Sequence, residues 1–294
     1  MVAHPSRMGF SKLKAGSTGS NPGGGAAKLP VSAALTHLLD DIGKASFYLN
    51  TIVVGLDAVE RGHEKPEALD IKWEPTDPIS AARMARHFAV EAFMVRASEA
   101  LSAFIKAYSA LPRFAPITGK WTKDTGLAEK VDDIASALLG GKNYLVAGAV
   151  VLVHWRNRIV HNGSFSLQPK HTATLTLDAQ KIHDAYRNLD IAMLLDHARV
   201  GRPTLKDVSC LIAMTINLAR RMDELVYTSF GKDDVVAWIF HFGLEPAIKK
   251  VIRETSRERV ADSIRRVLKS NAPRLETDFS RFCEPDGSDL IKEM

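Results

Sequence analysis

The sequence predicts an all-α protein built as a helical bundle. Apolar residues recur at the three- and four-residue spacing of amphipathic helices over most of residues 31–270. Prolines and glycines fall between these periodic segments, where they end one helix and begin the next. The chain has 294 residues, of which 46% are hydrophobic, so it can bury a sizeable core without disulfides. We therefore expect five or six long helices and no central sheet.

The N-terminal residues 1–30 predict a disordered basic arm. They contain the run Ser-Thr-Gly-Ser-Asn-Pro-Gly-Gly-Gly and four basic residues with no acid. Such a composition buries too little apolar surface to offset the ordering of the chain. Gly23–Gly25 has no strand before it and no Gly-Lys-Ser/Thr after it, so it does not predict a nucleotide-binding loop.

The helices that follow are set by their start and stop signals. Gly62 suits the end of the first helix, and Asp77-Pro78 combines an N-cap acid with proline at the first helical position. Pro112 ends this second helix, and Gly140-Gly141 ends the next. The expected helices cover residues 31–61, 78–111, 126–139, 143–162, 178–199, 203–231, 233–242, 245–256 and 258–270.

One segment departs from the helical pattern. Residues 164–177 include Thr-Ala-Thr-Leu-Thr-Leu, which alternates and is rich in β-branched residues, so it predicts a short strand or β-hairpin insertion. The periodic segments before and after it place the main helical bundle at residues 31–231. Residues 232–294 are expected to form a C-terminal helical extension with a basic helix and a loosely ordered tail.

A cluster of chemically active residues ends the most apolar helix. The uninterrupted apolar run Tyr144–Val153 is followed by Arg-Asn-Arg-Ile-Val-His at residues 156–161 and then by Asn162-Gly163, which suits a left-handed helix cap. Arginine, amide and imidazole groups are costly to bury without partners. We expect them to be exposed, paired across an interface, or functional.

This motif resembles the Arg-(four to six residues)-His signature of the HEPN superfamily, whose members are helical proteins and include metal-independent ribonucleases of toxin–antitoxin and antiphage systems. The resemblance implies a HEPN-like bundle and a catalytic pair formed by Arg156 and His161, with Asn157 in the polar position after the arginine. It also implies a homodimer in which each copy contributes to one composite cleft, and a cognate antitoxin or sensor protein as a partner.

The chemistry of RNA cleavage suits these residue types. Histidine titrates near neutral pH and can accept the proton of the 2′-hydroxyl group or protonate the leaving 5′-oxygen. Arginine binds phosphate oxygens through parallel donors and stabilises the charge that builds on phosphorus. At about 100° per residue, however, Arg156 and His161 point about 140° apart on a straight helix. Either the helix distorts, the arginine wraps around it, or a second copy completes the site.

Further basic residues are candidates for contacts with the RNA backbone. The net charge is +5, and residues 249–281 hold ten basic and five acidic residues. Arg158, Lys249, Lys250 and Arg253 are the candidates, although a solvated helix face explains the last three equally well. Two other functions stay open, a non-catalytic adaptor that binds RNA or a protein, and a DNA-binding regulator that uses the basic C-terminal helices.

The remaining composition indicates a cytoplasmic protein without cofactor, metal or membrane segment. Cys210 and Cys283 are too few for a disulfide framework or a Cys-based zinc site. His154 and His161 share a helix face but lie about 10 Å apart along the axis, too far to bind one metal ion. The apolar run at Tyr144–Val153 is about half the length of a membrane span, and no secretory signal is visible at the N-terminus.

Overall fold

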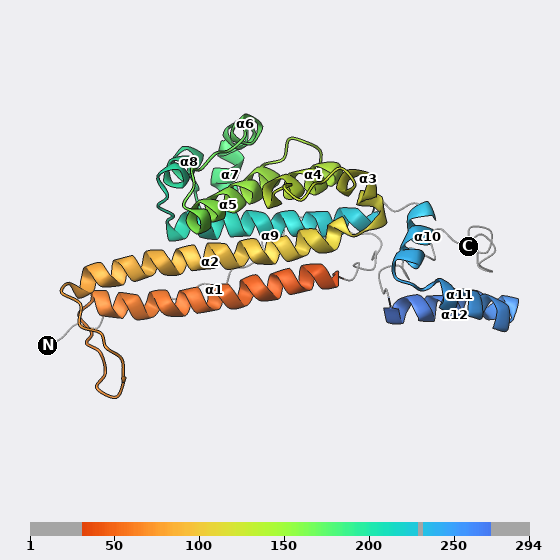
Figure 1. Cartoon of the computed structure of the whole chain (residues 1–294), viewed down its shortest axis with the longest axis horizontal. Coiled ribbons are helices and arrows are strands. Elements are labelled where there is room, and N and C mark those ends of the chain that lie inside the picture. The colour runs from red at the N-terminus through yellow and green to blue at the C-terminus, as the bar shows by residue number, and fades with distance from the viewer. Residues whose placement is uncertain (1–30, 229–231, 272–294) are drawn as a thin grey trace, which may run out of the picture.

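The computed structural model of the chain describes residues 31–228 and 232–271 and is all-α over these ranges, as predicted. The elements are, in chain order, α1 (Ala33–Glu60), α2 (Pro78–Ser109), η1 (Pro112–Phe114), α3 (Ala115–Thr118), α4 (Leu127–Leu139), α5 (Tyr144–His161), α6 (Pro169–Leu177), α7 (Ala179–Ala185), α8 (Ile191–Val200), α9 (Leu205–Thr228), α10 (Lys232–His241), α11 (Glu245–Glu254) and α12 (Arg257–Asn271). Figure 1 shows the long helices α1, α2, α5 and α9 side by side, with α6, α7 and α8 above them.

The two longest helices, α1 and α2, form an antiparallel hairpin along one side of the bundle (Figure 1). At their N-termini, Asp77 accepts hydrogen bonds from the backbone of Ile79 and Ser80, as predicted, and Ser32 accepts one from that of Leu35. One side of the hairpin buries a continuous row of apolar residues against the rest of the core. The opposite side is open, and in this pairing α2 lies between α1 and α5.

The centre of the bundle is α5, which carries the motif at its C-terminal end. It packs against α9, α4, α2 and α6, so every residue from Val146 to Val153 is buried, and Trp155 is fully buried. Gly148 allows the closest approach, because a Cβ atom there would lie 2.4 Å from the terminal methyl group of Met214 on α9. The helix ends at Asn162, which adopts the left-handed conformation (φ 49°) as predicted.

Two predictions for the region after the motif are wrong. The predicted strand or hairpin within residues 164–177 is a helix, α6, and the described residues contain no strand. In α6 the hydroxyl groups of Thr174 and Thr176 donate to backbone carbonyls four residues earlier, which accommodates β-branched residues in a helix. The single helix predicted at 178–199 is divided into α7 and α8, because Arg187 and Asn188 adopt positive φ angles.

The C-terminal helices lie at one end of the long axis of the molecule (Figure 1). Helix α10 contacts η1, and α11 pairs with α12. Buried apolar residues such as Trp238 and Ile248 join these helices to the same hydrophobic core. The boundary between bundle and extension at residue 231 stays a prediction, and the predicted arm (1–30) and tail lie outside the described residues. No helix in the described part of the chain is both long and apolar enough to cross a membrane.

Candidate functional site

The motif arginine lies between the two central helices. The side chain of Arg156 extends from α5 to α2, where its Nη2 atom lies 2.5 Å from Oε1 of Glu99. Its Nη1 atom donates to Oδ1 of Asn157 over 3.2 Å. Only 22% of the arginine side chain is exposed, against 50% of that of Glu99. The guanidinium group is therefore positioned by one carboxylate and one amide, and it is open to solvent on the side of Glu99.

The motif histidine occupies a different side of the helix. His161 is exposed in the last turn of α5, and no hydrogen bond or ion pair of its side chain occurs among the described residues. It continues the stripe formed by Val150, His154 and Asn157, because these positions are spaced by four, three and four residues. Arg156 faces α2 instead. A single copy therefore does not direct Arg156 and His161 at one point, as the helical geometry predicted.

The stripe leads into a cavity of about 220 Å³ between α4, α5 and the start of α6. Each helix contributes polar side chains: Glu129 and Asp132 come from α4, and His171 from α6. The lining is completed by Asp124, Gly126, Leu127, Ala128, Val150, His154, Asn157 and Gln168. Asn157 thus touches both parts of the site, since it accepts a hydrogen bond from Arg156 and lines the cavity.

Burial keeps the two cavity histidines neutral. It lowers the pKa of His154 below its usual value of 6.5, against a smaller opposing effect of the Glu129 charge. Burial also lowers the pKa of His171; Asp132 opposes this shift, while Lys170 and His154 add to it. His171 is only 5% exposed, and its Nε2 atom lies 3.8 Å from Oδ2 of Asp132. Both imidazoles are therefore mainly uncharged at pH 7.

The acidic residues of the cavity differ in how far their oxygens are occupied. Asp132 accepts from the hydroxyl group of Ser136 and pairs with Lys170. Glu129 accepts only the backbone N–H of Gly126, over 3.1 Å at the start of α4, among the described residues. In these residues no set of three or more His, Cys, Asp or Glu side chains is arranged to hold a metal ion.

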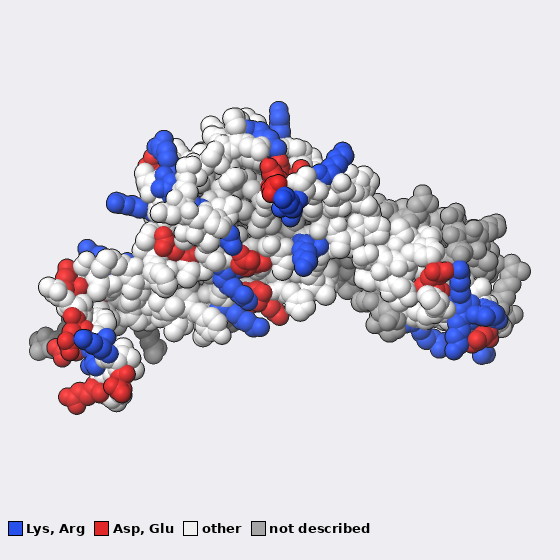
Figure 2. All heavy atoms as spheres, in the orientation of Figure 1, with Lys and Arg blue, Asp and Glu red and all other residues white. Residues whose placement is uncertain are grey.

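The structure does not bring the predicted RNA-backbone residues to Arg156. Arg158 points to the turn between α8 and α9, where its Nε atom would lie 2.7 Å from a Cβ atom at Gly201. Lys249 pairs with Glu245 over 2.6 Å on α11. Lys250 is 4.0 Å from Glu254, and Arg253 is exposed on the same helix. Figure 2 shows the charges of these C-terminal helices at the end of the molecule away from the main body.

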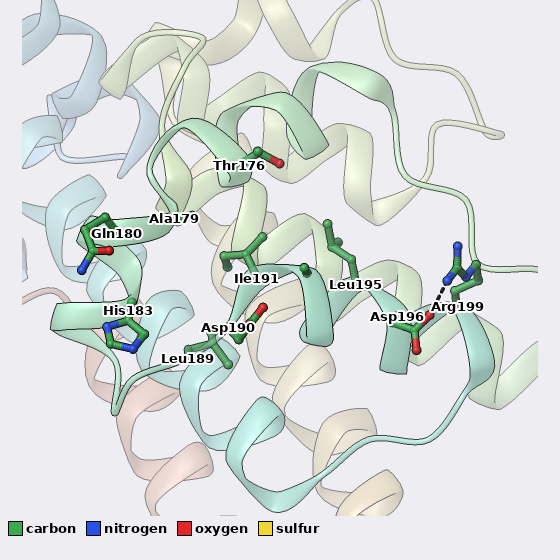
Figure 3. A pocket seen from close by; sticks show the side chains of 11 residues that line it. Thr176, Ala179, Gln180, His183, Leu189, Asp190, Ile191, Leu195, Asp196 and Arg199 are labelled. Atoms are coloured by element: carbon green, nitrogen blue, oxygen red, sulfur yellow. Dashed lines mark hydrogen bonds and ion pairs between the residues drawn. The ribbon is translucent and has the colours of Figure 1, made fainter.

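A larger cavity, of about 470 Å³, lies among α6, α7 and α8 (Figure 3). None of the predicted site residues lines it, and its polar side chains are already paired. Arg199 binds Asp196, as the dashed line in Figure 3 shows, and the side chain of Asp190 caps α8. His183 interacts with the neighbouring Asp184. This cavity therefore presents fewer free polar groups than the one beside the motif.

Sequence reasoning found part of the site and missed part. The motif residues Arg156, Asn157 and His161 follow from the sequence pattern, but their partners do not. The structure pairs Arg156 with Glu99 and places His154 in the lining of the cavity. Sequence reasoning did not identify His171 and Asp132. His171 lies on the segment predicted as a strand, and an aspartate on an amphipathic helix gives no sign of what it faces.

Comparisons with known proteins add no relative: no family model matches the chain, and no curated protein or solved structure matches it significantly. The resemblance to the HEPN superfamily therefore rests on the motif residues alone and stays a prediction.

Proposed function

We propose that the protein is a metal-independent endoribonuclease of HEPN type, which cleaves RNA by attack of the 2′-hydroxyl group at a site completed by a second copy of the chain. The observation that carries the proposal is the placement of the motif. Arg156 lies between α2 and α5, where it contacts Glu99 and Asn157, and His161 is exposed at the end of the same helix. In this role His161 transfers protons and Arg156 binds the scissile phosphate.

The pairing of Arg156 with Glu99 is compatible with phosphate binding. The guanidinium group has five N–H donors, and Glu99 and Asn157 occupy two of them. The Nε atom is buried and makes no hydrogen bond among the described residues. Because half of Glu99 is exposed, the ion pair is weak enough for a phosphate group to share or displace it.

An apolar face on the α1–α2 hairpin favours association with a second copy. Phe88 lies on the exposed side of α2, 71% exposed and three turns before Glu99. Tyr48 and Ile52 are 62% and 47% exposed on the flank of α1 that carries Asp41, and Asp41 pairs with Arg96 of α2 over 2.9 Å. Figure 2 shows mostly uncharged surface over this part of the hairpin. A two-fold contact through this α1–α2 apolar face would bring two copies of the motif to one interface.

The test is cleavage of a mixed RNA pool in EDTA, with product ends identified. Wild type is expected to give 2′,3′-cyclic phosphate and 5′-hydroxyl ends, and His161→Ala to give none, because the exposed side chain can be removed without loss of packing. His63→Ala, which removes an exposed histidine from the loop before α2, is the matched control and should cleave normally. Full cleavage by His161→Ala would rule out the proposed chemistry.

The second-copy requirement has its own test. Ile52→Asp is expected to shift the protein towards monomer in sedimentation experiments and to reduce cleavage. Val54→Asp is the matched control, because Val54 is 71% exposed but points about 140° from the Asp41 flank of α1. If both substitutions reduce cleavage equally, or if neither reduces it, the apolar face does not take part in the active site.

One observation favours a second candidate function. Arg156 already pairs with a carboxylate, as an arginine with a purely structural role would. Exposed apolar faces are also common on protein-binding surfaces. A non-catalytic adaptor that binds RNA or a protein would show altered binding or dimerisation in motif variants, and no variant, nor wild type, would cleave RNA.

A further inference from the structure

The cavity beside the motif has hydrogen-bonding groups that the fold leaves unused. Within residues 31–228 and 232–271, Glu129 accepts a hydrogen bond only through Oε2, from the backbone N–H of Gly126, and its Oε1 atom accepts none. Asn157 accepts from Arg156 through Oδ1, so its Nδ2 group is free to donate into the cavity. Gln168 makes no side-chain hydrogen bond among the described residues. The cavity therefore offers acceptors on α4 and donors on α5 and at the start of α6.

The charge of the lining determines which ligands fit. Asp124, Glu129 and Asp132 are acidic, and the lining itself holds no lysine or arginine. Lys170, just outside the lining of the cavity, forms an ion pair with Asp132. The two histidines are neutral at pH 7 because burial lowers the pKa of each. A phosphate group would be repelled here, whereas an uncharged ligand that presents N–H donors and one carbonyl acceptor would be bound.

We propose that this cavity is a base-binding subsite that accepts guanine. The guanine edge carries two adjacent N–H donors, which match the carboxylate of Glu129, and one carbonyl oxygen, which matches the free amide donors of Asn157 and Gln168. A volume of about 220 Å³ accommodates a purine. Adenine presents a donor where guanine has its carbonyl group and lacks the paired donors, so it leaves Glu129 unmatched.

The subsite rests on the proposed function and gives it a sequence preference. His161 lies one helical turn beyond Asn157 on the same stripe of α5, about 6 Å along the axis. Asn157 also hydrogen-bonds to Arg156 over 3.2 Å. A guanosine with its base in the cavity would extend its ribose along α5 towards His161, and the second copy would complete the site around its phosphate. Cleavage is then expected next to guanosine.

The experiment measures binding separately from cleavage. Binding of the four nucleoside monophosphates to the full chain is followed by titration calorimetry and by NMR signals of the histidine rings. Guanosine monophosphate is expected to bind at least about tenfold more tightly than the other three and to shift the signals of His154 and His171. Glu129→Gln should remove this preference, since its amide oxygen can still accept from Gly126 while the paired acceptor is lost.

Glu67→Gln is the matched control, because it removes an exposed carboxylate outside the cavity. It should bind like wild type. Equal binding of all four nucleotides, or the same preference in Glu129→Gln, would overturn the subsite, and so would the absence of any binding. Cleavage without base preference would support the ribonuclease proposal and contradict the guanine subsite. Guanine binding without cleavage of any RNA would support the subsite and contradict the ribonuclease proposal.

Discussion

The ion pair between Arg156 and Glu99 decides whether the motif arginine is structural or available to a phosphate group. At the 2.5 Å separation of Nη2 and Oε1, two unit charges attract by about 1.7 kcal/mol at the dielectric constant of water. Ordering two long side chains offsets part of this attraction, and half of Glu99 is in solvent. We expect a coupling free energy of about 0.5–1 kcal/mol, which a bound phosphate group can exceed.

A double-mutant cycle measures this coupling. The free energy of unfolding in urea is determined for wild type, Glu99→Gln, Arg156→Gln and the double variant, at low salt and at high salt, where screening should reduce the coupling. The pair of Arg96 and Asp41, with a separation of 2.9 Å and a more exposed arginine (58% against 22%), is the control and should give an equal or smaller value. A coupling above about 2 kcal/mol that persists at high salt would mean that Arg156 is locked to α2, and the phosphate-binding role would be refuted.

Other substitutions test the packing around the motif. Gly201→Ala should lower the free energy of unfolding by about 1–2 kcal/mol, because φ is +76° there and the new Cβ would press on Arg158; a neutral result in urea denaturation would contradict this geometry. Gly43→Ala, at a helical site with nothing within 4 Å, should instead raise it by about 0.5–1 kcal/mol. Trp155→Ala should cost about 3–5 kcal/mol, since the side chain is fully buried, and a loss below about 1 kcal/mol would show that α5 is not the centre of the core. His154 has a folded-state pKa below 6.5, so the unfolded chain binds its proton first and wild-type stability falls as the pH drops below about 6.5; His154→Gln should flatten this fall between pH 7 and pH 5 in urea titrations, and an unchanged profile would show that His154 is not buried in solution.

Local sequence signals predicted most of the helices, and the wrong prediction at residues 164–177 has its cause in tertiary packing. The side chain of Asp77 accepts from the first backbone N–H groups of α2, as its sequence position predicted, and Asn143, at the predicted start of α5, accepts from Leu145. Residues 172–177 satisfy two periodicities at once, since alternating Thr, Ala and Leu also place Thr174 and Leu175 on the buried side of a helix. Tertiary packing selects the helix there, which no pattern within the segment reveals.

For the candidate site too, the sequence identifies some residues, and only the fold reveals the others. Arg156, Asn157 and His161 are adjacent in sequence, so a pattern can single them out. The cavity is formed by residues from three helices, and Asp132 and His171 meet only because α4 and α6 pack on the same side of α5. Glu99 is 57 residues from Arg156, and its choice of partner depends on the register of α2 against α5. Such contacts require the fold itself.

The close packing of α5 against α9 also bears on the synthesis of the chain. Helix α9 begins at Leu205, 52 residues after Val153, the last residue of the apolar run in α5. At about 5–20 residues per second, translation of this interval takes roughly 3–10 s. During this time the side of α5 that contains Gly148 lacks its partner α9, which contributes Met214, although α2 and α4 have already been synthesised. The helix with the long apolar run Tyr144–Val153 thus leaves the ribosome before the helix that covers it, and chaperones are expected to bind the nascent chain at this stage.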